Sequence, residues 1–109
     1  MNLFLLSLRV DECARWHCDK HVVKMILEIV QMLYTSWHVN NPDDTRLMDA
    51  PLCISSGKPG YKKSHMNHPM AKWMRHSRGN YRFAVRLAAA LCLEFKFRYG
   101  KYHACTDHV

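Results

Sequence analysis

The sequence predicts an all-α protein: a compact single domain over residues 1–109, with about three main helices around a buried central helix. Strong helix formers dominate residues 11–37 without Gly or Pro, and a second helical run extends from Pro69 to Gly100. A chain of 109 residues, 49% of them hydrophobic, can bury one core but hardly two. The segment between the two runs, residues 38–67, is predicted to be a long irregular loop.

The N-terminal half combines a short apolar segment with the longest predicted helix. Asn2–Leu8 reads NLFLLSL and is either a buried strand or an N-terminal arm packed on the core. Asp11 can cap a helix that runs to Trp37, with a break near Asp19. Because the hydrophobic residues at positions 22–33 point in almost every direction around the axis, this helix is predicted to be central and largely buried.

Proline and glycine divide the second half of the chain. Residues 38–67 contain only one predicted short helix, Pro42–Asp49, and loops of this length are usually functional or disordered. Pro69 then occupies a first helical position. Gly79 is predicted to interrupt this helix, and Asn80 to cap the next one.

The charge balance favours a phosphate-bearing partner, DNA or a nucleotide. Lys and Arg number 16 against 9 Asp and Glu, which gives a net charge of +7. No run of about 18 apolar residues is present, so we expect no membrane partner. The five cysteines lack CxxC spacing, which favours reduced thiols and a cytoplasmic location.

Polar residues at alternating steps of four and three form a narrow stripe along the predicted central helix. They are His17, His21, Lys24, Glu28 and Gln31. Such a stripe on an otherwise apolar helix indicates a functional cleft, where burial would favour the uncharged forms of Lys24 and Glu28 that acid/base or imine chemistry requires. Alternatively, Lys24 and Glu28 form an ordinary i,i+4 pair on the solvent face.

A second group interleaves cations with aromatic residues. Its members are Tyr61, Lys62, Lys63, His65, Asn67, His68, Lys72 and Trp73. Cations bind phosphates and aromatic rings stack on bases, so we expect this group to bind nucleic acid. If the last two helices are nearly continuous, one face also carries four cations, with Arg78 beside it. These four are Lys72, Arg75, Arg82 and Arg86. The alternative is a solvated basic face, with Tyr61 and Trp73 in the core.

The cysteines and histidines near the start of the first predicted helix are the candidates for a metal site. Cys13, His17 and His21 are spaced by four, and Cys18 lies near them. Three ligands on one helix would make an unusual zinc site without further ligands at standard spacing, so we predict no metal and no cofactor. A glycine-rich phosphate loop and a nucleophile elbow are both missing, which makes P-loop NTPases and α/β hydrolases poor candidates.

The segment Asp19–Glu28, DKHVVKMILE, resembles the D-x-H-[LV]-x-x-x-x-x-E stretch of phage pyrimidine-dimer DNA glycosylase/AP lyases of the endonuclease V type. The resemblance implies a compact all-α, metal-independent DNA-repair enzyme in which Glu28 is the catalytic carboxylate. It also implies that the N-terminal α-amine, here that of Met1, forms an imine with the opened sugar. These glycosylases keep arginines beside the catalytic Glu, whereas Leu27 and Ile29 flank Glu28 here.

The chain also resembles a group of small phage and large-virus proteins that have no assigned activity. The shared segments are CDKHVVKMILE at 18–28, Y-K-x-x-H-x-N-H-P-x-x-x-W at 61–73 and R-Y-G-K at 98–101. This resemblance covers most of the chain and implies a viral protein.

The leading hypothesis is a base-excision enzyme, an N-glycosylase on DNA that could also act as an AP lyase. Glu28 would stabilise the cationic sugar or act as acid/base, with His21 beside it and the Met1 amine or Lys24 as the imine nucleophile. The alternative is a non-catalytic viral protein that binds nucleic acid or sequesters a small nucleotide. A third class, a protein-binding factor, would use the loop at 38–67.

Overall fold

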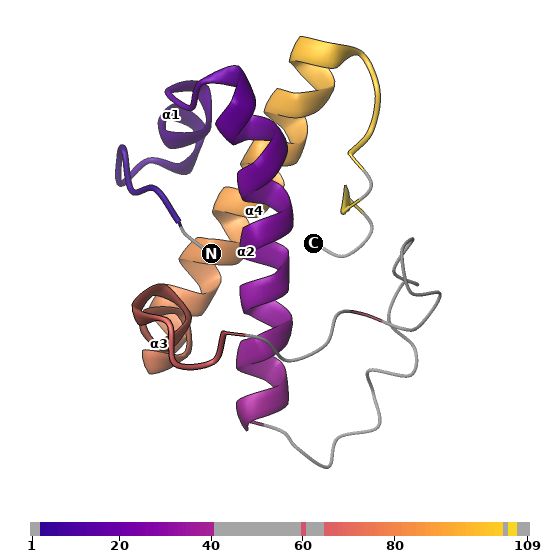
Figure 1. Cartoon of the computed structure of the whole chain (residues 1–109). Coiled ribbons are helices and arrows are strands. Elements are labelled where there is room, and N and C mark those ends of the chain that lie inside the picture. Colours follow the sequence, from indigo (N-terminus) through magenta and orange to yellow (C-terminus); the bar gives the residue numbers. More distant parts are fainter. Residues whose placement is uncertain (1–2, 41–59, 61–64, 104, 107–109) are drawn as a thin grey trace.

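The computed structural model describes residues 3–40, 60, 65–103 and 105–106, and in these it contains helices and no strand (Figure 1). The helices are α1 (Val10–Arg15), α2 (Asp19–Asn40), α3 (Pro69–His76) and α4 (Arg78–Tyr99). The predicted all-α fold is confirmed. Four helices form rather than about three, because the chain breaks once more before Asp19, where a break was expected.

The two 22-residue helices α2 and α4 pack against each other and carry most of the core. They run antiparallel, because Arg98 near the end of α4 reaches Asp19 at the start of α2. Helix α1 packs against α4, and α3 packs against both long helices, near the end of the molecule away from α1 (Figure 1). The largest fully buried apolar side chains are Ile26, Ile29, Met32, Met74, Leu87 and Leu91. Helix α2 is therefore largely buried, as predicted.

The apolar N-terminal segment is an arm and not a strand. Leu3 is buried in the core and Phe4 packs against it. The Cys13 thiol donates a hydrogen bond to the Phe4 carbonyl at 3.2 Å, and the Phe4 ring lies 4.7 Å from the His21 ring. The arm thus connects α1 to the start of α2.

The N-terminal ends of two helices differ from the prediction. Arg9, and not Asp11, is the N-cap of α1, and Asp11 lies in the first turn, where its charge is favourable to the helix dipole. Ser77, and not Gly79, separates α3 from α4: its backbone is extended, and its hydroxyl accepts a hydrogen bond from the Asn80 N–H at 3.1 Å. Asn80 therefore caps nothing, and its amide instead donates to the Trp73 carbonyl at 2.8 Å.

Other helix ends are placed as the sequence predicts. Pro69 is the first residue of α3, and His68 caps the helix by accepting from the Met70 N–H at 3.1 Å. Gly100 ends α4 in the left-handed conformation, with φ 70°. Helix α2 continues to Asn40, so residues 38–40, predicted to belong to the loop, are helical. The short helix predicted at Pro42–Asp49 lies outside the described residues.

Candidate nucleic-acid interface

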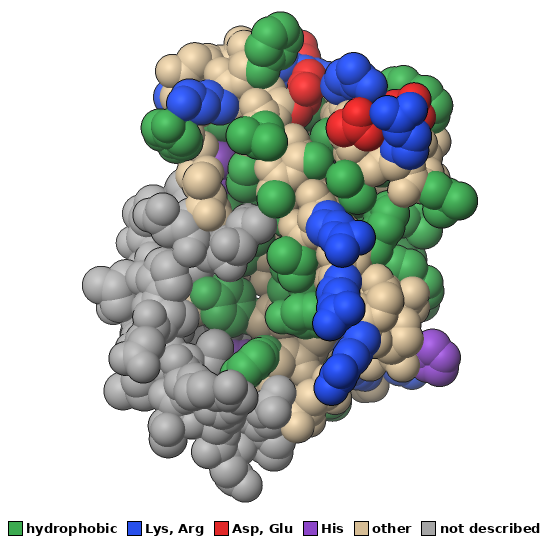
Figure 2. All heavy atoms as spheres, turned by 180° about the vertical axis from the view of Figure 1, so that it is seen from behind, with side chains coloured by type: hydrophobic (Ala, Val, Ile, Leu, Met, Phe, Trp, Pro, Cys, Tyr) green, Lys and Arg blue, Asp and Glu red, His purple; other side chains and the backbone are tan. Residues whose placement is uncertain are grey.

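Three arginines form a row on the outward face of α4. Arg78, Arg82 and Arg86 follow one another at four-residue steps, and all three are exposed. Residues four apart on an α-helix lie on one face, about 6 Å apart along the axis. Figure 2 shows Lys and Arg side chains in a column on this side of the molecule. The row is held on a capped helix that packs on α2, so its spacing is fixed.

The row differs from Arg9, Arg15 and Arg98 in having no acidic partner among the described residues. Within residues 3–40, 60, 65–103 and 105–106, no carboxylate lies within ion-pair distance of Arg78, Arg82 or Arg86. By contrast, Arg9 and Arg15 pair with Asp11 at 3.4 and 3.5 Å. The positive charge of the row is therefore not neutralised by these parts of the protein. Figure 2 shows the acidic side chains gathered at the other end of this face.

The cationic face predicted across the last two helices required them to be nearly continuous, and the extended backbone of Ser77 makes α3 and α4 discontinuous. Arg78, expected beside that face, belongs to the row with Arg82 and Arg86. Lys72 is exposed on α3. Arg75 is half-buried, and its Nη1 is enclosed without a hydrogen-bond partner.

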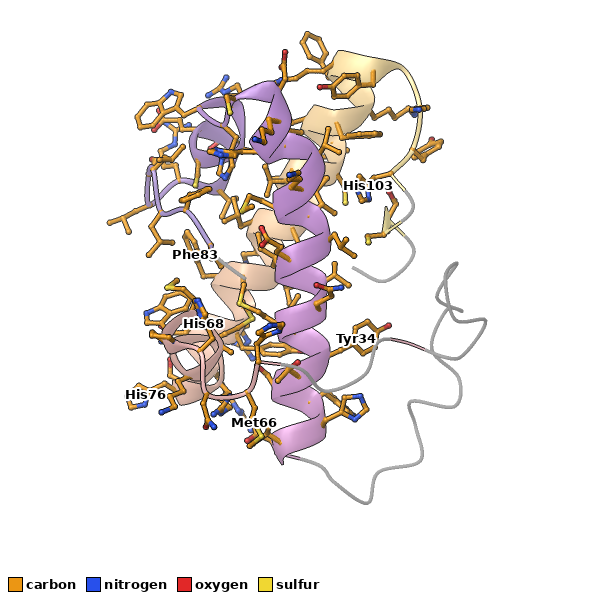
Figure 3. The ribbon with its side chains drawn as sticks, viewed as in Figure 1. Tyr34, Met66, His68, His76, Phe83 and His103 are labelled. Carbon is orange, nitrogen blue, oxygen red and sulfur yellow. The ribbon has the colours of Figure 1, made fainter. Side chains whose placement is uncertain are left out.

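Two of the residues predicted around the entrance to α3, His68 and Trp73, have structural roles. His68 is the N-cap of α3 and His76 lies at its other end (Figure 3). Trp73 is half-buried and meets Phe83 edge-on, with ring centroids 6.5 Å apart. This ring packs against the core and is not a free stacking surface. His65 and Asn67 are exposed. Tyr61, Lys62 and Lys63 lie outside the described residues.

The polar stripe of the central helix is divided between core and solvent. His17 lies in the connection between α1 and α2, almost fully buried. Its Nδ1 lies 2.6 Å from the Cys13 carbonyl oxygen, while its Nε2 has no hydrogen-bond partner. Burial lowers the pKa of His17 from its ordinary value of 6.5, and the nearby charges of His21 and Arg98 add to this effect. His17 is therefore a neutral, structural histidine near neutral pH.

The two residues predicted to do the chemistry have different surroundings. Lys24 is exposed, so burial cannot activate its amine. Glu28 is half-buried, and its Oε2 is fully enclosed. His21 is half-buried against Phe4, and Gln31 is half-buried further along α2. Met1, the other candidate for the nucleophile, lies outside the described residues.

A groove lies between α1 and α4, away from the polar stripe. Its lining residues are Asp11, Ala14, Arg15, Ala90, Leu93, Glu94 and Phe97. No group of three or more His, Cys, Asp or Glu side chains in the described part of the chain is placed to hold a metal ion. None of the four described helices is both long and apolar enough to cross a bilayer.

No family model, curated protein or solved structure matches this chain. The function is therefore inferred from the residues and their geometry. Sequence reasoning undervalued Arg78 and overlooked the apolar end of the same face, Leu93 and Phe97. The signal was present: residues 78, 82, 86, 89, 93 and 97 fall within about 100° on a helical projection. Recognising this pattern required the correct start of α4, at Arg78.

Proposed function

We propose that this protein binds nucleic acid through the arginine row Arg78, Arg82 and Arg86. The observation that carries the proposal is a row of exposed arginines on one face of a capped helix, with no carboxylate paired to them within the described residues. Like charges held side by side repel each other and destabilise the helix slightly. A polyanion removes that repulsion, and guanidinium groups bind phosphate oxygens with two parallel hydrogen bonds.

The salt dependence of binding tests the proposal directly. Each phosphate contact releases counterions, so three contacts give a slope of log affinity against log salt of about −3 on duplex DNA, or about −2 on a single strand. Arg82→Ala should make the slope shallower by about one unit. Lys20→Ala is the matched control, since Lys20 is an exposed cation at the start of α2, outside the row. A small-nucleotide-binding protein would instead show a weak slope and a preference for one base.

A second candidate, the base-excision enzyme, is favoured by the surroundings of Glu28. One oxygen of this carboxylate is enclosed, which fixes its position as catalysis requires. His21, two turns before Glu28, contacts Phe4 of the N-terminal arm, so the arm lies against the helix that carries the carboxylate. Glu28 would stabilise the cationic sugar, and the N-terminal amine is a better imine nucleophile than the exposed Lys24.

Single-turnover cleavage of damaged and abasic oligonucleotides tests this second candidate. Glu28→Gln keeps the shape of the side chain and should reduce cleavage by about 100-fold or more while leaving binding intact. A reductant added during the reaction should trap the imine as a stable adduct, which mass spectrometry assigns to the N-terminal residue or to Lys24. Equal cleavage by wild type and Glu28→Gln would remove Glu28 from the mechanism, and no cleavage by either would leave a binding protein.

A further inference from the structure

The outward face of α4 changes from cationic to apolar about one turn after the arginine row. Ala89, Leu93 and Phe97 continue the same face toward the C-terminal end of the helix, and all three are exposed. Leu93 is 72% exposed and Phe97 is 85% exposed, which is unusual for side chains of this size. One continuous face, about 28 Å long, thus presents three cations and then the apolar side chains Leu93 and Phe97. Lys96 lies at the edge of this apolar end, where its Nζ is 2.7 Å from the Tyr102 hydroxyl.

The groove between α1 and α4 adjoins this apolar end. Ala14 and Ala90 are small and leave space, and Leu93 and Phe97 form one wall. Asp11, Arg15 and Glu94 also line the groove, so two carboxylates face one cation there. Asp11 pairs with Arg9 and Arg15, and Glu94 pairs with Arg98. A phosphate would meet these carboxylate oxygens unfavourably, whereas the amino groups of bases donate hydrogen bonds to carboxylates. The groove therefore suits an uncharged, planar group with hydrogen-bond donors.

We propose that the polynucleotide bound by the arginine row is single-stranded, with phosphates on Arg78, Arg82 and Arg86 and an unpaired base stacked on Phe97 beside the groove. This inference rests on the proposed function and names its substrate class. Charge complementarity sets the order of contacts: the backbone lies where cations are unpaired, and bases lie where the surface is apolar. In a duplex the base faces are covered by their neighbours, so Phe97 could not reach one. The length of the face suits a site of about four nucleotides, at the lower end of single-strand binding sites.

Fluorescence anisotropy with a labelled single strand and a hairpin duplex of the same composition, each at several salt concentrations, tests the proposal. The single strand should bind more tightly. Phe97→Ala should weaken single-strand binding at least about fivefold, the loss expected when one stacked base is released, without changing the salt slope. Arg82→Ala should change the slope, and Phe97→Trp should restore affinity. Leu8→Ala is the matched control, because Leu8 is 89% exposed but precedes α1.

The outcomes separate this inference from the proposed function. Equal binding of both ligands, with Phe97→Ala matching wild type while Arg82→Ala weakens binding, overturns the single-strand inference and leaves the arginine row in place. No salt-dependent binding to either ligand overturns both. Sedimentation of the free protein tests whether the apolar surface instead joins two copies of the chain. If Phe97→Ala converts a dimer into a monomer without affecting single-strand binding, the surface is a dimer contact. The single-strand inference is then wrong.

Discussion

The two ends of α4 use arginine in opposite ways. Near the C-terminal end, Arg98 is mostly buried and contacts three segments: its Nη1 lies 2.9 Å from Asp19, its Nε lies 2.8 Å from Glu94, and its Nη2 donates to the Arg15 carbonyl at 3.0 Å. At the N-terminal end, the arginine row is exposed and has no carboxylate partner in the described chain. The same residue type therefore holds the fold together at one end and remains available to a ligand at the other.

This difference shows that the arginines of the two ends are not equally available to an anionic ligand. The arginines near Arg98 are largely neutralised by Asp11, Asp19 and Glu94, so they contribute little to the field of the protein. The arginine row is not neutralised by a carboxylate of the described residues. A polyanion is therefore expected to approach the N-terminal end of α4 first, even though both ends are rich in arginine.

The largest effect is expected from reversing the charge of the row. Arg82→Glu combined with Arg86→Glu should weaken polynucleotide binding roughly 100-fold or more, because like charges facing each other cost several kcal/mol. The stability should change by less than about 0.5 kcal/mol, since both side chains are exposed. Anisotropy and thermal unfolding measure the two effects. Arg82→Lys with Arg86→Lys serves as the control and should keep most of the binding; if the reversed protein binds as tightly as wild type, the row is not the interface.

Arg98 should show the opposite result. Arg98→Ala leaves Glu94, whose side chain is only 15% exposed, without its partner and disconnects α4 from the start of α2. We expect a loss of about 2 kcal/mol, between the values for exposed and buried ion pairs, and a fall of about 10 °C in Tm. The folded variant should bind nucleic acid as wild type does. If Arg98→Ala instead lowers affinity without lowering Tm, the two ends of α4 do not differ as described.

Sequence reasoning could predict the helices but not the partners of their charges. The apolar pattern of α2 and the Pro69 and Gly100 signals are local, and each is confirmed. The pair between Arg98 and Asp19 joins residues 79 positions apart, so no local pattern reveals it. Without knowledge of this pair, the sequence does not distinguish the paired Arg98 from the unpaired arginine row.

The candidate site was missed in part because one helix start was placed wrongly. Asn80 and Ser77 are both good N-caps, and the choice between them depends on a tertiary contact, the bond from Asn80 to the Trp73 carbonyl. With α4 starting at Arg78, this arginine joins the row instead of lying beside it. The division of the polar stripe is also tertiary, since the arm at Phe4 helps to bury His17 and covers His21 but not Lys24.

Lowering the pH should reduce the stability of the fold without weakening nucleic-acid binding per folded molecule. Burial lowers the pKa of His17, and also that of His103, below the ordinary value of 6.5, so the unfolded chain binds more protons in that range. The stability these residues contribute is complete above about pH 6.5 and declines as the pH falls toward their folded-state pKa, by at most about 1.4 kcal/mol per pH unit for each group.

Denaturant unfolding between pH 5 and pH 8 measures this effect, and the double variant His17→Gln with His103→Gln should flatten the profile whatever its absolute stability. The contacts proposed for the arginine row involve neither histidine, so affinity per folded molecule should not follow the stability profile. A profile that is equally steep in the double variant would assign the acid sensitivity to other groups.

The smallest effect is expected at the junction where the row begins. The Ser77 hydroxyl accepts the Asn80 N–H at 3.1 Å, and Ser77→Ala removes this cap at a cost of about 1 kcal/mol, or about 5 °C in Tm. Ser77 is exposed, so no packing is lost with it. Ser77→Asp keeps an acceptor and adds a charge favourable to the helix dipole, so it should be at least as stable as wild type.

Because fraying is confined to the first turn, Ser77→Ala should disturb Arg78 alone and weaken binding less than Arg82→Ala does. Equal Tm values for all three proteins would mean that the bond from Asn80 to the Trp73 carbonyl, and not the Ser77 cap, fixes the start of α4.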